Sequence, residues 1–288
     1  MDFGRVITAM VTPFNDQLEI DWTRVEPLVD YLINEQKSDG IVVCGTTGES
    51  PTLTENEKLK LIAAVAKHAQ GRCKIIAGTG SNSTAHTIEF SKEVVKQGGI
   101  DALLLVAPYY NKPTQEGLYQ HFKTVTEAVQ FPVILYNVPG RTGVNIDADT
   151  TIRLSQIPNI VATKDCADTN QLSRIVFGAA EGFTVYSGED SMTLPAVAVG
   201  CHGIISVASH VVGKEMQELI AAYTSGNIKR AAEINAELLP VLTGMFCAPS
   251  PAPVKYALKL KGFDAGGVRL PLVQLNDEDE KFVASLIK

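Results

Sequence analysis

Two apolar runs near the middle of the chain, residues 102–108 (ALLLVAP) and residues 132–138 (PVILYNV), decide the class of fold. Each run is apolar on both faces, which is typical of a parallel strand covered by helices. The two runs begin roughly thirty residues apart, the length of one strand–helix–strand unit. We therefore expect a parallel sheet built from βα units.

The same pattern recurs on both sides of this pair. Six further runs follow a similar spacing: residues 6–12, 40–45, 74–80, 160–165, 183–188 and 203–209. Eight strands in strict alternation with helical patterns predict a (β/α)8 TIM barrel. An open doubly wound sheet is the alternative, but such a sheet seldom sustains eight units without an edge strand or a subdomain break.

Helix signals lie between these runs and after the last one. Asp21 is placed to cap a helix, and Thr54 with Glu57 forms a capping box before another. Beyond the eighth run the pattern is helical only, over residues 214–224, 228–244, 253–260 and 277–287. The sequence therefore predicts a catalytic barrel over residues 1–225 and a C-terminal helical extension over residues 226–288.

The composition describes a globular, acidic chain. Its 288 residues carry a formal charge of −7, from 25 Lys and Arg against 32 Asp and Glu. This balance argues against a nucleic-acid or anionic-membrane surface, which would require clustered basic side chains. Residues 1–7 hold no apolar core of a signal peptide, and the five cysteines share no CxxC spacing. We expect a cytoplasmic protein with reduced cysteines and with neither nucleic acid nor membrane as a partner.

Lys164 is the most informative candidate for chemistry. In a barrel of this kind, chemistry lies at the C-terminal ends of the strands and in the loops that follow. Lys164 is the second-to-last residue of the sixth run, where a charged side chain is seldom buried without a purpose. Burial disfavours the charged form of an amine, so Lys164 could attack a carbonyl and form a Schiff base. The alternative is an ion pair between Lys164 and Asp165.

Other strand ends add four candidates. The Tyr136 hydroxyl could donate or accept a proton, although a buried tyrosine with a satisfied hydroxyl is the plainer alternative. Thr46 and Thr47 lie in a tight turn between two glycines, which could hold a small carboxylate or simply cap the next helix. Arg141 follows a Pro-Gly pair in a loop and suits bidentate carboxylate binding, with a surface salt bridge as its alternative.

Signals for other chemistries are weak. The glycines at positions 78 and 80 lack the third glycine of a dinucleotide-binding fingerprint, and no GKS or GKT sequence marks a P-loop. The five histidines have no metal-ligand spacing, and no GxSxG elbow indicates serine hydrolysis. We therefore expect neither a cofactor nor a metal.

Three motifs together resemble those of the dihydrodipicolinate synthase family of pyruvate-dependent class I aldolases. They are the turn at residues 45–50 (GTTGES), the segment at residues 136–142 (YNVPGRT) and the late-strand Lys164. Their order and spacing match from Val6 to the C-terminal helices. The resemblance implies a lyase that condenses pyruvate with L-aspartate 4-semialdehyde to 4-hydroxy-tetrahydrodipicolinate, the first committed step towards diaminopimelate and lysine.

The resemblance also implies the catalytic roles. Lys164 would form the Schiff base with pyruvate, and Tyr136 would donate and accept protons. Thr46 and Tyr110 would complete the proton relay. In the family, the tyrosine that matches Tyr110 reaches in from a neighbouring subunit. A homodimer is then required for a complete site, and a homotetramer made of two dimers is expected.

Substrate binding is implied in the same way. Thr47 and the backbone at Ile205 would contact pyruvate, Gly188 would line the pocket, and Arg141 would hold the carboxylate of aspartate semialdehyde. The nearest rival is another superfamily aldolase, such as an N-acetylneuraminate lyase or a keto-deoxy sugar-acid aldolase, which does not usually carry the Arg141 position. A rival of another class is a non-catalytic barrel that binds a keto acid, but Lys164 and Tyr136 are both present.

The resemblance finally bears on feedback by lysine. Lysine-sensitive relatives bind the amino acid at the dimer interface, near positions matching Ser50, Glu55, Lys58, Asn82, His86 and Tyr109. Those relatives typically carry histidines at the positions of Glu55 and Lys58, and a glutamate at the position of His86. His86 cannot neutralise a lysine ammonium group, and Lys58 adds a like charge. We expect this chain to be insensitive to lysine, or nearly so, although Glu55 could compensate in part.

Overall fold

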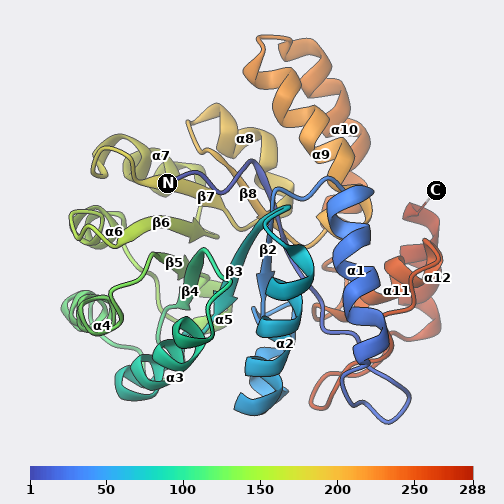
Figure 1. Cartoon of the computed structure of the whole chain (residues 1–288). Helices are drawn as coiled ribbons and strands as arrows, with labels where there is room; N and C mark the ends of the chain where they lie inside the picture. Colours follow the sequence, from blue (N-terminus) through green and yellow to red (C-terminus); the bar gives the residue numbers. More distant parts are fainter. Residues whose placement is uncertain (288) are drawn as a thin grey trace.

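Eight short parallel strands close into a barrel in the computed structural model, which describes residues 1–287 (Figure 1). The strands are β1 (Val6–Ala9), β2 (Gly40–Val43), β3 (Lys74–Gly78), β4 (Ala102–Val106), β5 (Val133–Asn137), β6 (Ile160–Asp165), β7 (Thr184–Ser187) and β8 (Gly203–Ser206). Each strand pairs with the next, and β8 pairs with β1, with Val6 opposite Ile204. The predicted TIM barrel is confirmed, and the open sheet is wrong.

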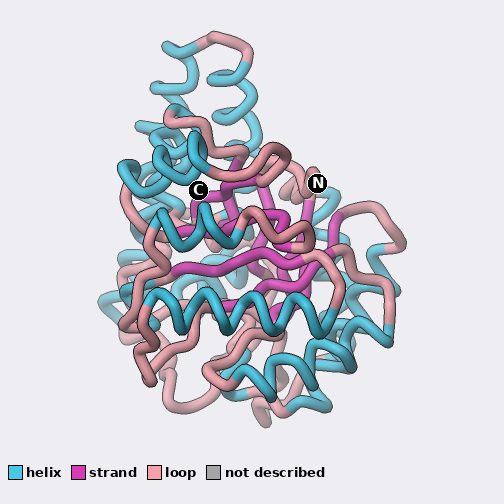
Figure 2. The backbone as a smooth tube through the Cα atoms, turned by 90° about the vertical axis from the view of Figure 1, so that its left-hand side faces the viewer, coloured by secondary structure: helices cyan, strands magenta, loops and turns pink. Residues whose placement is uncertain are grey.

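Helices surround the strands on the outside, as the tube view shows (Figure 2). They are α1 (Trp22–Asn34), α2 (Glu55–Ala69), α3 (Thr84–Gln97), α4 (Gln115–Val129), α6 (Ala148–Leu154), α7 (Thr169–Gly178), α8 (Thr193–Ala198) and α9 (Ser209–Thr224). The predicted caps are present: Asp21 accepts from the Thr23 N–H, and Thr54 and Glu57 form a capping box. In residues 1–287 no helix is both long and apolar enough to cross a membrane.

The short elements lie in loops at the C-terminal ends of strands. They are the 3₁₀ helices η1 (Ser50–Thr52) and η2 (Asp190–Met192) and the single helical turn α5 (Pro139–Thr142). Arg141 therefore lies in a helical turn, where the sequence predicted a loop. Pro139 opens this turn and Gly143 ends it with a φ of 72°, which is the usual distribution of these two residues at helix ends.

The core has two layers because side chains alternate across each strand. One layer lies between the strands and the helices, and the other fills the inside of the barrel. Tyr136 belongs to the inner layer, together with Ala162. Since Lys164 is two residues beyond Ala162 and pairs with Tyr136 in the register, its side chain shares the inner face. Asp165 takes the opposite face.

Three helices follow the barrel: α10 (Ile228–Gly244), α11 (Ala252–Leu260) and α12 (Asp277–Leu286). Their bounds agree with the predicted helices to within a residue. Helices α9 and α10 form a hairpin that projects beyond the barrel, while α11 and α12 lie together (Figure 1). The C-terminal helical region is thus confirmed, and the division at residue 225 stays a prediction. Lys288, the last residue of the predicted extension, lies outside the described residues.

Several strands end earlier than the sequence predicted, and the boundary between β8 and α9 is displaced as a result. The run at residues 203–209 was expected to be a strand throughout, with the next helix from residue 214, but β8 ends at Ser206 and α9 begins at Ser209. The carboxylate of Asp190 accepts hydrogen bonds from the backbone N–H groups of Val207 and Ala208, at 3.1 and 2.8 Å. These bonds turn the chain out of the sheet, and an apolar run cannot reveal that.

Candidate active site

Lys164 and Tyr136 come together at the ends of β6 and β5. The two residues are register partners, and each is only 5% exposed. The Lys164 Nζ lies over the Tyr136 ring, 4.5 Å from the ring centre. An ammonium group over an aromatic face is attracted to it, so the ring holds the lysine without consuming its donors. The structure therefore joins the two leading candidates of the sequence.

Lys164 has no carboxylate partner among the described residues. Asp165, its neighbour in sequence, accepts instead from the Asn137 side chain, the Ala167 N–H and the Gln171 side chain, at 3.0, 2.7 and 2.8 Å. The alternative of a Lys164–Asp165 ion pair is wrong, because adjacent strand residues point to opposite faces. Burial raises the pKa of the Asp165 carboxyl, while these donors act in the opposite direction.

Gly188 provides the space that the lysine occupies. A Cβ atom at this position would lie 2.7 Å from Lys164 Cε and 2.4 Å from Cys166 Sγ, far closer than van der Waals contact. The Gly188 N–H donates to the Asp165 carbonyl at 2.9 Å, which fixes the approach of the two strand ends. The Cys166 thiol is not a competing nucleophile at neutral pH, since burial raises its pKa to about 12.

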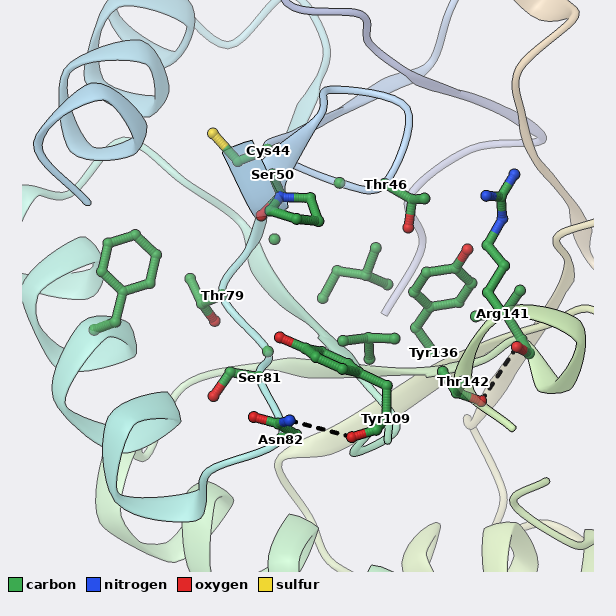
Figure 3. A pocket seen from close by; sticks show the side chains of 18 of the residues that line it. Cys44, Thr46, Ser50, Thr79, Ser81, Asn82, Tyr109, Tyr136, Arg141 and Thr142 are labelled. Carbon is green, nitrogen blue, oxygen red and sulfur yellow. Dashed lines mark hydrogen bonds between the residues drawn. The ribbon is translucent and has the colours of Figure 1, made fainter. Parts of the chain in front are cut away.

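A cavity of about 510 Å³ opens beside Tyr136. Figure 3 shows Thr46, Tyr136 and Arg141 around one end of it. Tyr136 lies between the cavity and Lys164. It lines the cavity, and its ring contacts the Lys164 ammonium group. The volume is in the range of sites for small metabolites, and its walls combine apolar and polar side chains.

Backbone hydrogen bonds within the turn at residues 45–50 give it its local shape. The Gly48 N–H donates to the Gly45 carbonyl at 3.1 Å, and the Glu49 N–H donates to the Thr46 carbonyl at 3.0 Å. Thr54, not Thr46 or Thr47, caps helix α2. The alternative that the two threonines serve as helix caps is therefore wrong, and the turn is free to present polar groups.

Arg141 is exposed and forms no ion pair with any described residue. Two hydrogen bonds fix the segment that follows its helical turn. The Thr142 hydroxyl donates to the Val144 carbonyl at 2.8 Å, and the Asn137 side chain accepts from the Ile146 N–H at 2.9 Å. The salt-bridge alternative for Arg141 is wrong. The guanidinium stays available on a fixed turn at the cavity mouth.

Five predicted residues, Lys164 among them, are not part of the cavity lining. Thr47 and Ile205 are buried at the barrel mouth, and Gly188 lies on the Lys164 side of Tyr136. Tyr110 is 89% exposed in the loop after β4 and adopts a φ of 74°. This single chain does not place Tyr110 in its own site.

Most of the positions that match the lysine-binding positions of lysine-sensitive relatives also line this cavity. Its lining includes Ser50, Lys58, Asn82, His86 and Tyr109. Glu55 does not line it, and pairs instead with the ring of His86 at 3.3 Å. The Lys58 ammonium lies 5.6 Å from the centre of the Phe90 ring. Desolvation lowers the pKa of Lys58, and the nearby Cys44 and Glu55 oppose this effect.

Sequence reasoning missed a second buried lysine near this site. Lys255 of α11 is 3% exposed and pairs with Glu49 in the turn after β2, at 2.8 Å. The available signal was a lone lysine within the apolar segment at residues 252–258, since lysine is rarely buried without a partner. Residues 1–287 contain no cluster of three or more side chains arranged to hold a metal ion.

The fold and site define a class first: a (β/α)8 barrel with a buried lysine at a strand end that has no ion-pair partner among the described residues. The chain belongs to the dihydrodipicolinate synthetase family, whose sequence model matches residues 2–288.

Individual relatives cover nearly the whole chain. The 4-hydroxy-tetrahydrodipicolinate synthase of Listeria monocytogenes serotype 4a is 55% identical over 96% of this chain and 95% of its own. The 4-hydroxy-tetrahydrodipicolinate synthase of Heliobacterium modesticaldum is also 55% identical, over 100% of this chain and 96% of its own. The crystal structure of a dihydrodipicolinate synthase from Bacillus anthracis is 51% identical and superposes with a TM-score of 0.97, covering 100% of this chain and 98% of the other.

Proposed function

We propose that this protein condenses pyruvate with L-aspartate 4-semialdehyde to 4-hydroxy-tetrahydrodipicolinate, through a Schiff base on Lys164. Membership of the family gives the reaction. The observation that carries the assignment to this site is the buried Lys164 amine, which lies against Tyr136 without a carboxylate partner among the described residues. An amine that is not engaged in an ion pair keeps its lone pair available once it is neutral.

The first step joins pyruvate to the enzyme. The neutral Lys164 amine adds to the carbonyl carbon of pyruvate, and loss of water leaves an imine. Thr47 and the backbone at Ile205 hold the pyruvate carboxylate, and Gly188 keeps the lysine side chain free of steric conflict. Tyr136 supplies and removes the protons that the addition and the loss of water require, because its hydroxyl end faces the cavity.

The second step forms the carbon–carbon bond. The protonated imine withdraws electrons from the pyruvate methyl group, which loses a proton and becomes an enamine carbon. This carbon attacks the aldehyde carbon of the semialdehyde, and the new alkoxide takes a proton through Tyr136 and its relay with Thr46 and Tyr110. The amino group of the semialdehyde then replaces the lysine nitrogen, which closes the ring and releases Lys164.

Arg141 selects the second substrate. Its guanidinium has no partner among the described residues and stands at the cavity mouth, where it can grip the carboxylate of the semialdehyde in a bidentate manner. A substrate that offers a neutral polyol at this place forms no charge-assisted, bidentate pair with the guanidinium. The residue therefore favours aspartate semialdehyde over sugar-acid substrates.

The site is completed by a second copy of the chain. Tyr110 is 89% exposed and lies outside its own cavity, as expected for a side chain that enters a neighbouring subunit. We infer a homodimer as the active unit and a homotetramer made of two dimers as the full assembly. Mixing Tyr110→Phe with Lys164→Ala protein should restore activity, since hybrid dimers contain one site with both native residues. Hybrids that are verified but inactive would contradict a shared site.

The reaction itself is tested by turnover. Pyruvate with aspartate semialdehyde should be converted, and N-acetylneuraminate should not be cleaved. Cleavage of N-acetylneuraminate would favour the rival aldolase. If pyruvate bound without forming a trappable imine, the protein would be a keto-acid-binding barrel instead. We propose a cytoplasmic location, consistent with the free cysteines among the described residues.

A further inference from the structure

The turn at residues 45–50 is held from behind by the C-terminal helical region. Glu49 is 2% exposed and adopts a φ of 56°, a left-handed conformation that a residue other than glycine seldom keeps unless its surroundings fix it. Lys255 of α11 donates to Glu49 Oε1 at 2.8 Å, and the backbone N–H of Arg269 donates to Glu49 Oε2 at 2.8 Å. Both carboxylate oxygens are therefore bound by residues that follow the barrel in sequence.

The two basic residues are themselves anchored. The Lys255 ammonium also donates to the Gly267 carbonyl at 2.6 Å. The Arg269 guanidinium donates to Glu57 Oε1 at 2.6 Å, and this bond holds the pKa of the Glu57 carboxyl at about 2. Two cations and two carboxylates thus form a neutral set. Such a set persists at low exposure only when its geometry is well satisfied.

An aromatic ring and a close backbone approach complete the anchor. The Phe14 ring lies 4.2 Å from Lys255 Nζ and 4.6 Å from Arg269 Cζ, measured to the ring centre, so it attracts both cations. The Phe14 N–H donates to the Ala265 carbonyl at 3.0 Å. A Cβ on Gly266 would lie 2.0 Å from the Phe14 carbonyl oxygen, and its φ is 72°, so this approach requires glycine.

The anchor reaches the cavity through one backbone hydrogen bond. The Glu49 N–H donates to the Thr46 carbonyl, and Thr46 lines the cavity beside Tyr136. We propose that Glu49, Lys255 and Arg269 are positioning residues, which hold Thr46 and Thr47 in the geometry that pyruvate requires. The proposal rests on the proposed function, because the two threonines have their roles there. Under this proposal, residues of the C-terminal helical region position groups in the active site.

The proposal is tested with the double variant Glu49→Gln/Lys255→Met. Both charges are removed together and both side chains keep nearly their length, so no unpaired charge is left in the interior and the fold is retained. Lys74→Met is the control for loss of a lysine ion pair far from the turn. The Lys74–Asp101 pair has the same length of 2.8 Å but lies at the start of β3, at the opposite end of the barrel. All rates are normalised to folded protein.

For the double variant we expect kcat/KM for pyruvate to fall about tenfold or more, because small displacements of positioning groups are costly to rate. The rate of imine trapping by borohydride should fall in parallel, while KM for aspartate semialdehyde stays unchanged. Amide hydrogen exchange of residues 45–53 should become faster. Lys74→Met should behave like wild type in each of these measurements.

A double variant with wild-type kcat/KM for pyruvate and wild-type exchange at residues 45–53 would overturn the proposal. So would an equal loss in Lys74→Met, because the effect would then reflect general destabilisation. Failure of the proposed function is a separate result, in which the wild-type protein neither turns over nor traps pyruvate. The exchange measurement is independent of activity and still decides whether the anchor holds the turn.

Discussion

Two lysines are buried to almost the same degree near the mouth of the barrel, and they differ in what surrounds the amine. Lys164 is 5% exposed and Lys255 is 3% exposed. Lys255 donates to a carboxylate and to a backbone carbonyl, whereas Lys164 faces the ring of Tyr136 and has no ion-pair partner among the described residues. Burial alone therefore does not identify a reactive lysine. Our proposal that Lys164 is the reactive lysine rests instead on the lack of an acid beside it among the described residues.

The contrast has an electrostatic basis. Desolvation lowers the pKa of Lys255 to about 8, and Glu49 opposes this effect by stabilising the charged form. An ammonium group that is bound by two acceptors stays protonated, and its nitrogen is not available to attack a carbonyl. An amine against an aromatic face keeps its place through a weaker attraction, which a substrate carbonyl can replace.

The largest expected effect separates the two lysines by reactivity. Borohydride reduction in the presence of pyruvate should add a pyruvate-derived mass to the peptide that contains Lys164 and leave the Lys255 peptide unmodified. Lys164→Met should lower kcat on the order of a thousandfold or more, because the covalent intermediate is lost. Peptide mass spectrometry and turnover measure the two quantities. A label on Lys255, or on neither lysine, would reverse the comparison.

The next effect separates them by stability. Lys255→Met leaves the Glu49 carboxylate buried without its partner, which should reduce the free energy of unfolding by about 3–5 kcal/mol. Lys164→Met removes an amine that has no ion-pair partner in residues 1–287, so the free energy of unfolding should change by less than about 1 kcal/mol or increase. Urea titrations of the two variants measure the difference. Equal losses would show that Lys164 is also a structural residue.

A smaller effect sharpens the account of the Lys164 side. Gly188→Ala places a methyl group 2.7 Å from Lys164 Cε, so the lysine must shift. Imine formation should slow by about a hundredfold, as expected when a reacting group is displaced by about an ångström. Stopped-flow trapping with pyruvate tests this, with circular dichroism to verify the fold. A folded variant with normal imine formation would show that the space at Gly188 is not needed.

Arg141→Ala should have a more selective effect. Imine formation precedes arrival of the aldehyde, so trapping of pyruvate should be largely intact. KM for aspartate semialdehyde should rise about tenfold, since a charge-assisted hydrogen bond is lost. Steady-state kinetics with each substrate varied in turn separate the two. An equal loss in both steps would indicate that Arg141 supports the turn rather than the substrate.

The smallest expected effect is the response to lysine. Glu55, the acid that could have received a lysine ammonium, is paired with His86, and Lys58 adds a like charge to the cavity. Without a charge-assisted bond worth about 1.5–3 kcal/mol, affinity for lysine should be at least about tenfold weaker than in a sensitive relative. Initial rates should stay nearly constant up to several millimolar lysine. Strong inhibition well below about one millimolar would contradict this.

Sequence alone located the eight strands, the C-terminal helices and the pair of Lys164 and Tyr136. These features depend on local patterns: apolar runs of strand length, helix caps, and polar residues at the ends of runs. Such patterns can be read from the sequence because each strand and helix buries one face, which places apolar residues at regular intervals along the chain. The positions of Thr46 and Arg141 near Tyr136 followed from the same argument, since parallel strands bring their carboxyl ends together.

Tertiary structure decided what each buried charge touches. The sequence left a Lys164–Asp165 ion pair open, and the structure showed instead that Asp165 is bound by Asn137, Ala167 and Gln171. The sequence did not connect Glu49 with Lys255, because 206 positions separate them and no local pattern encodes such a contact. The energy of a buried charge depends on partners within a few ångströms, and those partners come from any part of the chain.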